Sequence, residues 1–194
     1  MAAGKTKYLV LAADGSGKIP PLLAEILPKT EYEVLPASAT AGQIRRLIPD
    51  RRVDLLVINA PLKDEFGTQL AQDLANRNLG VLLLTPADVF DQVCCRVESS
   101  GVMTLAKPIS RQTLYMALRA VTALRAKLLQ MEQKTLTLQR KMEDVRTVNH
   151  AKWLLMENDH MSEQDAHRYI EKQSMDMRLT RREVAESIIR SIGC

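Results

Sequence analysis

Residues 54–59 of the 194-residue chain read Asp-Leu-Leu-Val-Ile-Asn, and the run from Leu55 to Ile58 is apolar without interruption. Strands covered on both faces of a parallel sheet have this continuous apolar character. We predict strands at Tyr8–Ala12, Tyr32–Leu35, Asp54–Asn59, Val81–Thr85 and Val102–Ala106. Helical patterns separate them at Pro20–Ile26, Ala41–Leu47, Gly67–Ala75 and Phe90–Ser99. This alternation predicts an α/β fold with a doubly wound, five-stranded parallel sheet.

After Pro108 the pattern changes to that of a long helix. From Leu114 apolar residues recur at alternating spacings of three and four, and residues 111–147 contain no Gly or Pro. A period of 3.5 predicts a left-handed coiled coil, roughly 55 Å long at about 1.5 Å per residue. A fold-back hairpin is the alternative, but no turn signal supports it, so we expect a parallel homodimer. The expected dimer seam consists of Val121, Leu124, Leu128, Met131, Leu138, Met142 and Val145.

The last part of the chain predicts a small three-helix unit. Residues 148–156 close the long helix, and two capping-box-like starts follow, Ser162-Glu-Gln-Asp165 and Thr180-Arg-Arg-Glu183. We therefore divide the chain into an α/β domain over residues 1–112, a dimerisation helix over residues 113–147 and an all-α module over residues 148–194.

Composition and charge exclude several classes of function. Hydrophobic residues make up 46% of the chain, which predicts a packed core, but no apolar run approaches the roughly 18 residues of a membrane span. The net charge of +4 is concentrated in residues 111–150, which carry 8 basic and 3 acidic residues, so bulk charge does not indicate a nucleic-acid binder. Neither the cysteines nor the histidines have metal-site spacing. We expect a cytoplasmic protein with no membrane attachment, cofactor or metal.

No motif in the chain indicates an enzyme. Gly15-Ser-Gly-Lys18 departs from the phosphate-binding loop pattern, which requires Gly where Ala12 stands and Ser or Thr where Ile19 stands. No Ser or Cys lies in a nucleophile-elbow motif, so we expect neither catalysis nor a small-molecule substrate.

The five β/α units, with Thr85 ending the fourth strand and Lys107-Pro108 ending the fifth, resemble a two-component receiver domain over residues 5–122. The resemblance implies an acidic pair that holds Mg²⁺ and a phosphoacceptor aspartate at the end of the third strand. In this chain these positions fall on Ala12, Ala13 and Asn59. Phosphoryl transfer needs a carboxylate nucleophile and a cation, so we predict a degenerate pseudo-receiver. Asp14, one residue beyond the pair, is the alternative metal ligand.

The C-terminal part resembles an ANTAR domain, the RNA-binding module of the AmiR and NasT antitermination regulators. The residues that carry the resemblance are Ala151-Lys-Trp-Leu-Leu-Met156, then Ser162, Ala166, Ile170 and Val184-Ala185, within residues 140–192. Trp153 stands where the family has a small residue, and Ser174 where it tends to have Ala. The order of receiver, coiled coil and ANTAR domain is also that of the family.

The resemblance implies an antiterminator that binds paired hairpins in nascent transcripts. We expect the predicted homodimer to be regulated by a protein partner in place of aspartyl phosphorylation. RNA loops are bound by stacking and by cations on the backbone. The residues that would supply these contacts are Lys152, Trp153, Arg168, Tyr169, Lys172, Arg178, Arg181 and Arg182. The tail carries 7 basic and 8 acidic residues, which keeps open a protein-interaction adaptor whose ANTAR fold does not bind RNA. A regulator phosphorylated at an atypical site is a further alternative, and Trp153 is either buried between helices or exposed.

Overall fold

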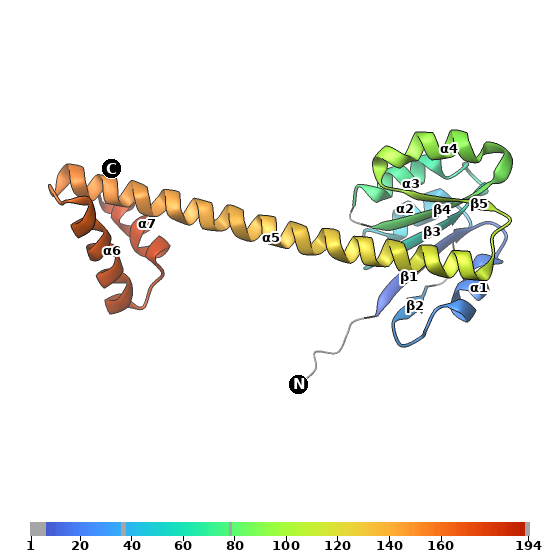
Figure 1. The fold of residues 1–194 in the computed structure, drawn as a ribbon, viewed down its shortest axis with the longest axis horizontal. Coiled ribbons are helices and arrows are strands. Elements are labelled where there is room, and N and C mark those ends of the chain that lie inside the picture. The colour runs from blue at the N-terminus through green and yellow to red at the C-terminus, as the bar shows by residue number, and fades with distance from the viewer. Residues whose placement is uncertain (1–6, 36–37, 78, 193–194) are drawn as a thin grey trace. The chain divides into compact units, whose positions relative to one another are not determined.

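The computed structural model describes residues 7–35, 38–77 and 79–192 of the chain, which divides into two compact units between Leu129 and Gln130. Helix α5, Arg111–Asn158, runs through this boundary without a break (Figure 1). The fold-back hairpin is therefore excluded for α5. Within the described residues no helix has the length and apolarity needed to cross a membrane.

The N-terminal unit is built on a five-stranded parallel sheet in the order β2-β1-β3-β4-β5. Its strands are β1 (Tyr8–Asp14), β2 (Tyr32–Val34), β3 (Leu55–Asn59), β4 (Gly80–Pro86) and β5 (Met103–Lys107). All five predicted strands are present, with ends that differ by at most two residues, and the doubly wound fold is confirmed. In this topology the switch point lies between β1 and β3, where ligands bind at the carboxyl ends of the strands.

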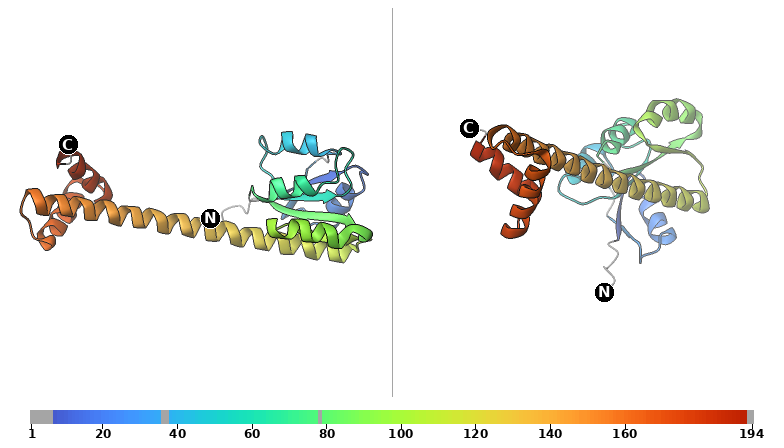
Figure 2. Two further views of the ribbon diagram at one scale, coloured as in Figure 1. Left: turned by 90° about the horizontal axis from the view of Figure 1, so that it is seen from above. Right: turned by 60° about the vertical axis from the view of Figure 1, so that its left-hand side comes forward.

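Helices cover both faces of the sheet (Figures 1 and 2). One buried cluster packs α1 (Ile19–Ile26) and the start of α5 against one face. A second cluster packs α2 (Ala41–Leu47), α3 (Thr68–Ala75) and α4 (Phe90–Val97) against the other. Short 3-10 turns, η1 (Ala87–Val89) and η2 (Glu98–Ser100), flank α4, so the helix predicted to reach Ser99 ends at Val97. This double coverage explains the continuous apolar runs of the central strands.

The first turns of α5 belong to the core of the N-terminal unit. Leu114, Ala117, Leu118 and Val121 are buried there together with side chains of β1, β3 and β4. The assignment of Val121 to the dimer seam is therefore wrong, because this side chain is only 7% exposed. Its heptad spacing is genuine, but the sheet occupies that face of the helix. The apolar stripe becomes exposed from Leu124 onward.

A buried ion pair fixes α5 to the sheet. Asp54, directly before β3, is fully buried and accepts a hydrogen bond of 2.9 Å from the backbone N–H of Leu9. Its other oxygen lies 2.9 Å from the Arg125 guanidinium of α5. A buried carboxylate needs such a partner, because an unpaired charge in a protein interior is strongly destabilising. The pair therefore fixes the position of α5 along the sheet.

The C-terminal unit contains the end of α5, α6 (Glu163–Met177) and α7 (Arg181–Ile192). The three helices share one core, which consists of Ala151, Leu155, Ala166, Ile170, Val184, Ala185 and Ile188. Both predicted helix starts are confirmed. The Ser162 hydroxyl accepts from the Asp165 backbone N–H at 3.2 Å. Thr180 and Glu183 form a reciprocal capping box, with bonds of 2.7 and 3.3 Å between each side chain and the other's backbone N–H.

Gly80→Ala tests how closely α5 packs on the sheet. A Cβ at Gly80 would lie 2.6 Å from side-chain carbons of both Leu55 and Val121, so one of them must move. Overpacking of this kind costs about 2 kcal/mol. We expect urea unfolding, followed by circular dichroism, to show that loss in the N-terminal unit. Gly42→Ala, in α2, is the matched control. The new Cβ would meet only the Asp64 carboxylate, at 3.6 Å, so the free energy of unfolding should stay the same or rise. Equal destabilisation by both would contradict the close packing.

Candidate functional site

A chain of three polar side chains joins the carboxyl ends of β1, β3 and β5. Asp14 and Asn59 face each other in the register of β1 and β3. The Asn59 amide donates to Asp14 Oδ1 at 2.9 Å, and Lys107 Nζ donates to Asn59 Oδ1 at 3.0 Å. Lys107 Nζ also donates to the Ala60 carbonyl at 2.6 Å. The Asn59 carboxamide is therefore held at both ends, by the carboxylate on one side and the ammonium on the other.

Asp14 accepts three further hydrogen bonds besides the one from Asn59. Its two oxygens also accept from the Ser16 backbone N–H at 2.8 Å, the Ser16 hydroxyl at 2.7 Å and the Ile19 backbone N–H at 2.8 Å. Burial raises the pKa of Asp14, but these hydrogen bonds, led by that from Ile19, outweigh it and leave the pKa below 3.8. Burial also lowers the pKa of Lys107, against the opposing charge of Asp14. Asp14 thus acts as a local anchor for the β1–α1 turn.

The other residues that correspond to a receiver's phosphorylation site make no polar contacts. Ala12 and Ala13 are fully buried, Ala12 in the core beneath α1 and α5 and Ala13 in the opposite core. Thr85 is also fully buried, and its hydroxyl has no hydrogen-bond partner among the described residues. Lys107 and Asn59 are therefore brought together with Asp14, while the alanines and Thr85 are not part of the polar chain.

The Mg²⁺ of a phosphorylated receiver does not fit these residues. Asp14 is the single carboxylate in the polar chain, and its oxygens already accept four hydrogen bonds from protein donors. Mg²⁺ is normally held by one or two carboxylates with open coordination positions. Among the described residues, no group of three or more His, Cys, Asp or Glu side chains is arranged to hold a metal.

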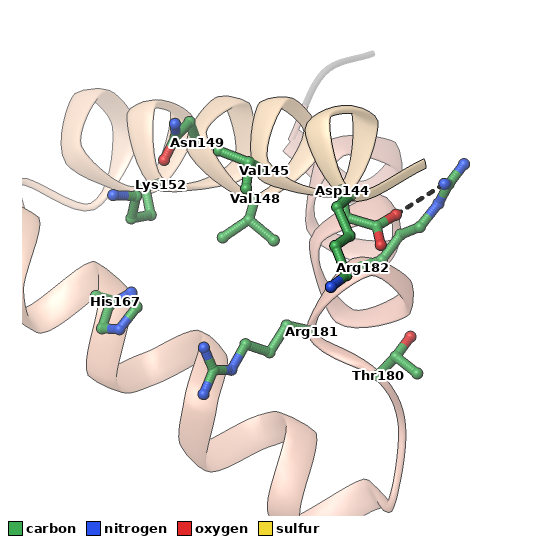
Figure 3. A pocket seen from close by; sticks show the side chains of 10 residues that line it. Asp144, Val145, Val148, Asn149, Lys152, His167, Thr180, Arg181 and Arg182 are labelled. Atoms are coloured by element: carbon green, nitrogen blue, oxygen red, sulfur yellow. Dashed lines mark hydrogen bonds and ion pairs between the residues drawn. The ribbon is translucent and has the colours of Figure 1, made fainter. Parts of the chain in front are cut away.

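The C-terminal unit contains a cavity of about 650 Å³ between α5, α6 and the start of α7 (Figure 3). Val148 points from α5 into the space between α5 and α6, and Arg181 extends from α7 toward α6 (Figure 3). The lining is Lys141, Asp144, Val145, Val148, Asn149, Lys152, His167, Thr180, Arg181 and Arg182. Three predicted RNA-binding residues, Lys152, Arg181 and Arg182, therefore meet at one cavity.

Three of the cations at this cavity, Lys152, Arg181 and Arg182, are already paired. Lys152 Nζ lies 2.9 Å from Glu163, and Arg181 lies 2.8 Å from Glu171. Arg182 pairs with Glu186 at 2.8 Å and with Asp144 at 2.9 Å, which raises the pKa of the guanidinium. The bond to Asp144 joins α7 to α5 (Figure 3). The role of Arg182 in this geometry is to hold the helices together.

Other predicted RNA-binding residues lie outside the cavity. Arg168 and Lys172 are exposed on α6, one turn apart, and form no ion pair within the described part of the chain. Tyr169 beside them is 39% exposed. Arg178 is exposed at the left-handed residue that ends α6. Trp153, on α5, is 55% exposed, so its burial between helices is excluded within this unit.

Sequence reasoning missed the central roles of two residues. The sequence predicts Asp14 only as an alternative metal ligand. Its place beside Asn59 depends on the register between β1 and β3, which the sequence does not reveal. Asp144 was not singled out, because the sequence spacing of α5 and α7 does not reveal its bond to Arg182. Both contacts depend on how elements far apart in the sequence pack together.

Comparison with known proteins identifies a domain family in the C-terminal part of the chain. Residues 136–189 match the ANTAR domain family. The chain is also 26% identical over 185 residues to the transcriptional regulatory protein PdtaR of Mycobacterium tuberculosis, covering 95% of this chain and 90% of that protein. The C-terminal unit is an ANTAR domain. The match begins at residue 136, within α5.

Solved structures similar to this chain show the fold of the N-terminal unit. The signal receiver domain of an HD domain-containing protein from Pseudomonas fluorescens Pf-5 is 22% identical, with a TM-score of 0.58 over 67% of this chain and 97% of that one. A CheY-like receiver domain protein from Methanospirillum hungatei is 20% identical, with a TM-score of 0.56 over 63% and 98%. The chain therefore joins a receiver-like domain to an ANTAR domain.

Asp14→Asn tests the anchoring role of the carboxylate. The substituted side chain carries an NH₂ in place of one oxygen, so it turns a donor toward either the Ile19 N–H or the donors of Ser16 and Asn59. We expect a loss of about 2 kcal/mol near neutral pH, typical of bonds to a charged group. Because the folded pKa lies below 3.8, ionisation of Asp14 stabilises the protein fully above that value. As the pH falls through the folded pKa, the difference between wild type and variant should shrink. Urea midpoints of wild type and variant, measured from neutral pH down through the folded pKa, check this prediction. A difference in midpoint that does not depend on pH would contradict it.

Proposed function

We propose that the chain is a dimeric transcription antiterminator whose ANTAR domains bind hairpins in nascent RNA, and that a protein partner controls it without aspartyl phosphorylation. The observation that carries the proposal is the ANTAR domain at residues 136–189, in a chain similar over most of its length to a transcriptional regulatory protein. On this proposal the protein regulates transcription by binding RNA and does not catalyse a reaction.

The exposed face of α6 supports RNA binding. Arg168 and Lys172 lie one turn apart without carboxylate partners among the described residues, and Tyr169 adds an exposed aromatic ring. Cations neutralise backbone phosphates, while an aromatic ring stacks on an unpaired base. Lys152, Arg181 and Arg182 are weaker candidates, because each would have to leave a carboxylate to contact a phosphate.

The exposed stripe of α5 supports a homodimer. The predicted seam residues from Leu124 to Val145 are each 54–61% exposed. They are Leu124, Leu128, Met131, Leu138, Met142 and Val145. An apolar stripe with heptad spacing on an uncovered helix is typical of a two-stranded coiled coil. Linking two ANTAR domains in this way raises the affinity for two adjacent hairpins by effective concentration.

The polar chain of Asp14, Asn59 and Lys107 supports control without phosphorylation. A carboxamide is a poor nucleophile, and Lys107 already donates to Asn59 and to the Ala60 carbonyl. A protein partner that covers the receiver-like domain or α5 would replace the chemical switch, by blocking either dimerisation or the RNA-binding face.

A second candidate function is an adaptor that binds proteins and not RNA. The pairing of Lys152, Arg181 and Arg182 with carboxylates favours it, since these residues offer little free charge. The two functions differ in whether any two-hairpin RNA binds with a salt-dependent affinity.

RNA binding is tested with the double variant Arg168→Ala/Lys172→Ala. We expect wild type to bind a two-hairpin RNA, with an affinity that falls as salt rises. The variant should bind at least about tenfold more weakly, and the salt slope should fall by about 1.4 in magnitude, or about 0.7 for each lost phosphate contact to single-stranded RNA. Fluorescence anisotropy at several salt concentrations measures both quantities.

The control for this experiment is Lys29→Ala/Arg46→Ala, which removes the same charge from exposed positions of the receiver-like domain. Its affinity and slope should remain those of wild type. Equal weakening by both variants would show that only net charge matters. Absence of binding to any such RNA, with the fold intact, would support the adaptor.

The absence of aspartyl phosphorylation has its own test. Wild type incubated with acetyl phosphate and Mg²⁺ should gain no phosphoryl mass in intact-mass spectrometry, because Asn59 is not a nucleophile and Asp14 accepts four hydrogen bonds from the protein. A receiver domain with a complete acidic site, run in parallel, serves as the positive control. A phosphoryl group found on the N-terminal unit would contradict this part of the proposal.

A further inference from the structure

The apolar seam of α5 continues into the ANTAR domain. If Met142 and Val145 are taken as positions a and d of a heptad, the next positions are Asn149 at a, Lys152 at d and Met156 at a. A single Asn at an a position is a feature that sets the register of two-stranded coiled coils. Lys152 at d carries a charge that Glu163 of the same chain neutralises. The seam can therefore extend as far as Met156.

Two features of the ANTAR domain lie on opposite sides of this seam. In the same heptad Val148 takes position g and Trp153 position e. Val148 lines the cavity of about 650 Å³, together with the seam residues Val145, Asn149 and Lys152. Trp153 does not line that cavity; it borders a smaller hollow with Met156 and Glu163. The indole therefore lies on the wrong side of α5 to fill the cavity of its own chain.

In a parallel two-stranded coiled coil, a residue at g lies beside the residue at e five positions further along the other helix. Val148 and Trp153 are five positions apart. We propose that Trp153 of each chain inserts into the cavity beside Val148 of the second copy, so that two reciprocal tryptophan seats join the ANTAR domains. This inference rests on the parallel homodimer of the proposed function and adds the residue that joins its C-terminal ends.

The cavity suits an indole ring. Val145 and Val148 supply apolar surface, and the Arg181 guanidinium and His167 lie across the cavity (Figure 3). A tryptophan buries about 150–250 Å² on insertion, and Arg beside an aromatic face adds a cation–π attraction. Trp153 is 55% exposed in the single chain, so much of that area is available for burial.

Charges along the helix bear on the same register. Lys127 at g lies five positions before Glu132 at e, which is an attractive pair between parallel helices. Lys141 and Arg146 have the same spacing and repel each other. The apolar pair of Val148 and Trp153 follows one heptad later, where it offsets this repulsion at the end of the seam that bears the ANTAR domains.

An RNA base is the other occupant to consider for the indole. The hollow beside Trp153 is bordered by Lys152 and Glu163, whose charges pair at 2.9 Å, so Lys152 would have to leave Glu163 to contact a phosphate next to a stacked base. Arg168 and Lys172, which form no ion pair within the described residues, lie on α6 and do not border this hollow. The surroundings of Trp153 therefore favour an apolar protein cavity over a nucleic acid.

Trp153 is the single tryptophan of the chain, so its fluorescence reports the seat directly. We expect blue-shifted emission and protection from iodide quenching in the dimer. Dilution through the dissociation constant, measured in parallel by analytical ultracentrifugation, should shift the emission to the red and restore quenching. Leu128→Asp, which places a charge in the seam far from Trp153, should give the dissociated spectrum at every concentration.

Substitutions at Trp153 measure its contribution to the dimer. Trp153→Ala should raise the dimer dissociation constant by about 100-fold, or about tenfold for each of two seats, and Trp153→Phe should recover most of the loss. Tyr169→Ala removes another exposed aromatic ring of the same domain, outside the heptad seam, and should change the constant by less than about twofold.

The outcomes separate this inference from the proposed function. A dimer that dissociates with no change in Trp153 emission would overturn the seat and leave the dimeric antiterminator standing. Emission that responds to RNA, but not to dilution, would overturn it in favour of base stacking. A chain that is monomeric at all concentrations would overturn both the seat and the proposed dimer.

Discussion

The contact on which the N-terminal unit depends is that of α5 with the sheet through Asp54 and Arg125. The buried carboxylate fixes where along the sheet the helix lies, and Leu114, Leu118 and Val121 fill the core on the same side. A single helix then continues to Asn158 and supplies the core of the ANTAR domain. The same helix carries the apolar stripe that is exposed from Leu124 onward.

The polar chain in the receiver-like domain is a hydrogen-bonded network at the carboxyl ends of β1, β3 and β5. Asn59 accepts from Lys107 and donates to Asp14, something a carboxylate at the same place cannot do without a proton. The amide therefore satisfies both neighbours by hydrogen bonds. On the proposed function, the residue that stands in place of the nucleophile thus also joins Asp14 to Lys107, beside two buried alanines.

Local patterns predicted the fold well, because buried strands, helix caps and heptads are written in short stretches of sequence. The strands around Leu55–Asn59, the capping box of Thr180 and Glu183, and the unbroken α5 all follow from such stretches. Val121 was assigned wrongly because its heptad spacing does not say whether a sheet or a second helix covers it. Asp14 and Asp144 act through partners 45 and 38 residues away, so only the folded structure shows their roles.

The pairing of charges inside the ANTAR domain bears on how such a small unit can bind RNA. Three of the six carboxylates of α6 and α7 form ion pairs: Glu163 with Lys152, Glu171 with Arg181 and Glu186 with Arg182. The same pairs remove those arginines as free cations, so a single domain presents little net attraction for a polyanion. Affinity on the proposed function then has to come from two domains acting together, which makes the effective concentration set by α5 the decisive quantity. A rigid joint between the two domains increases that concentration by restricting their separation, and a loose one lowers it. The continuous helix and the seam that extends along it into the ANTAR domain are therefore as much a part of the proposed RNA-binding device as the cations of α6.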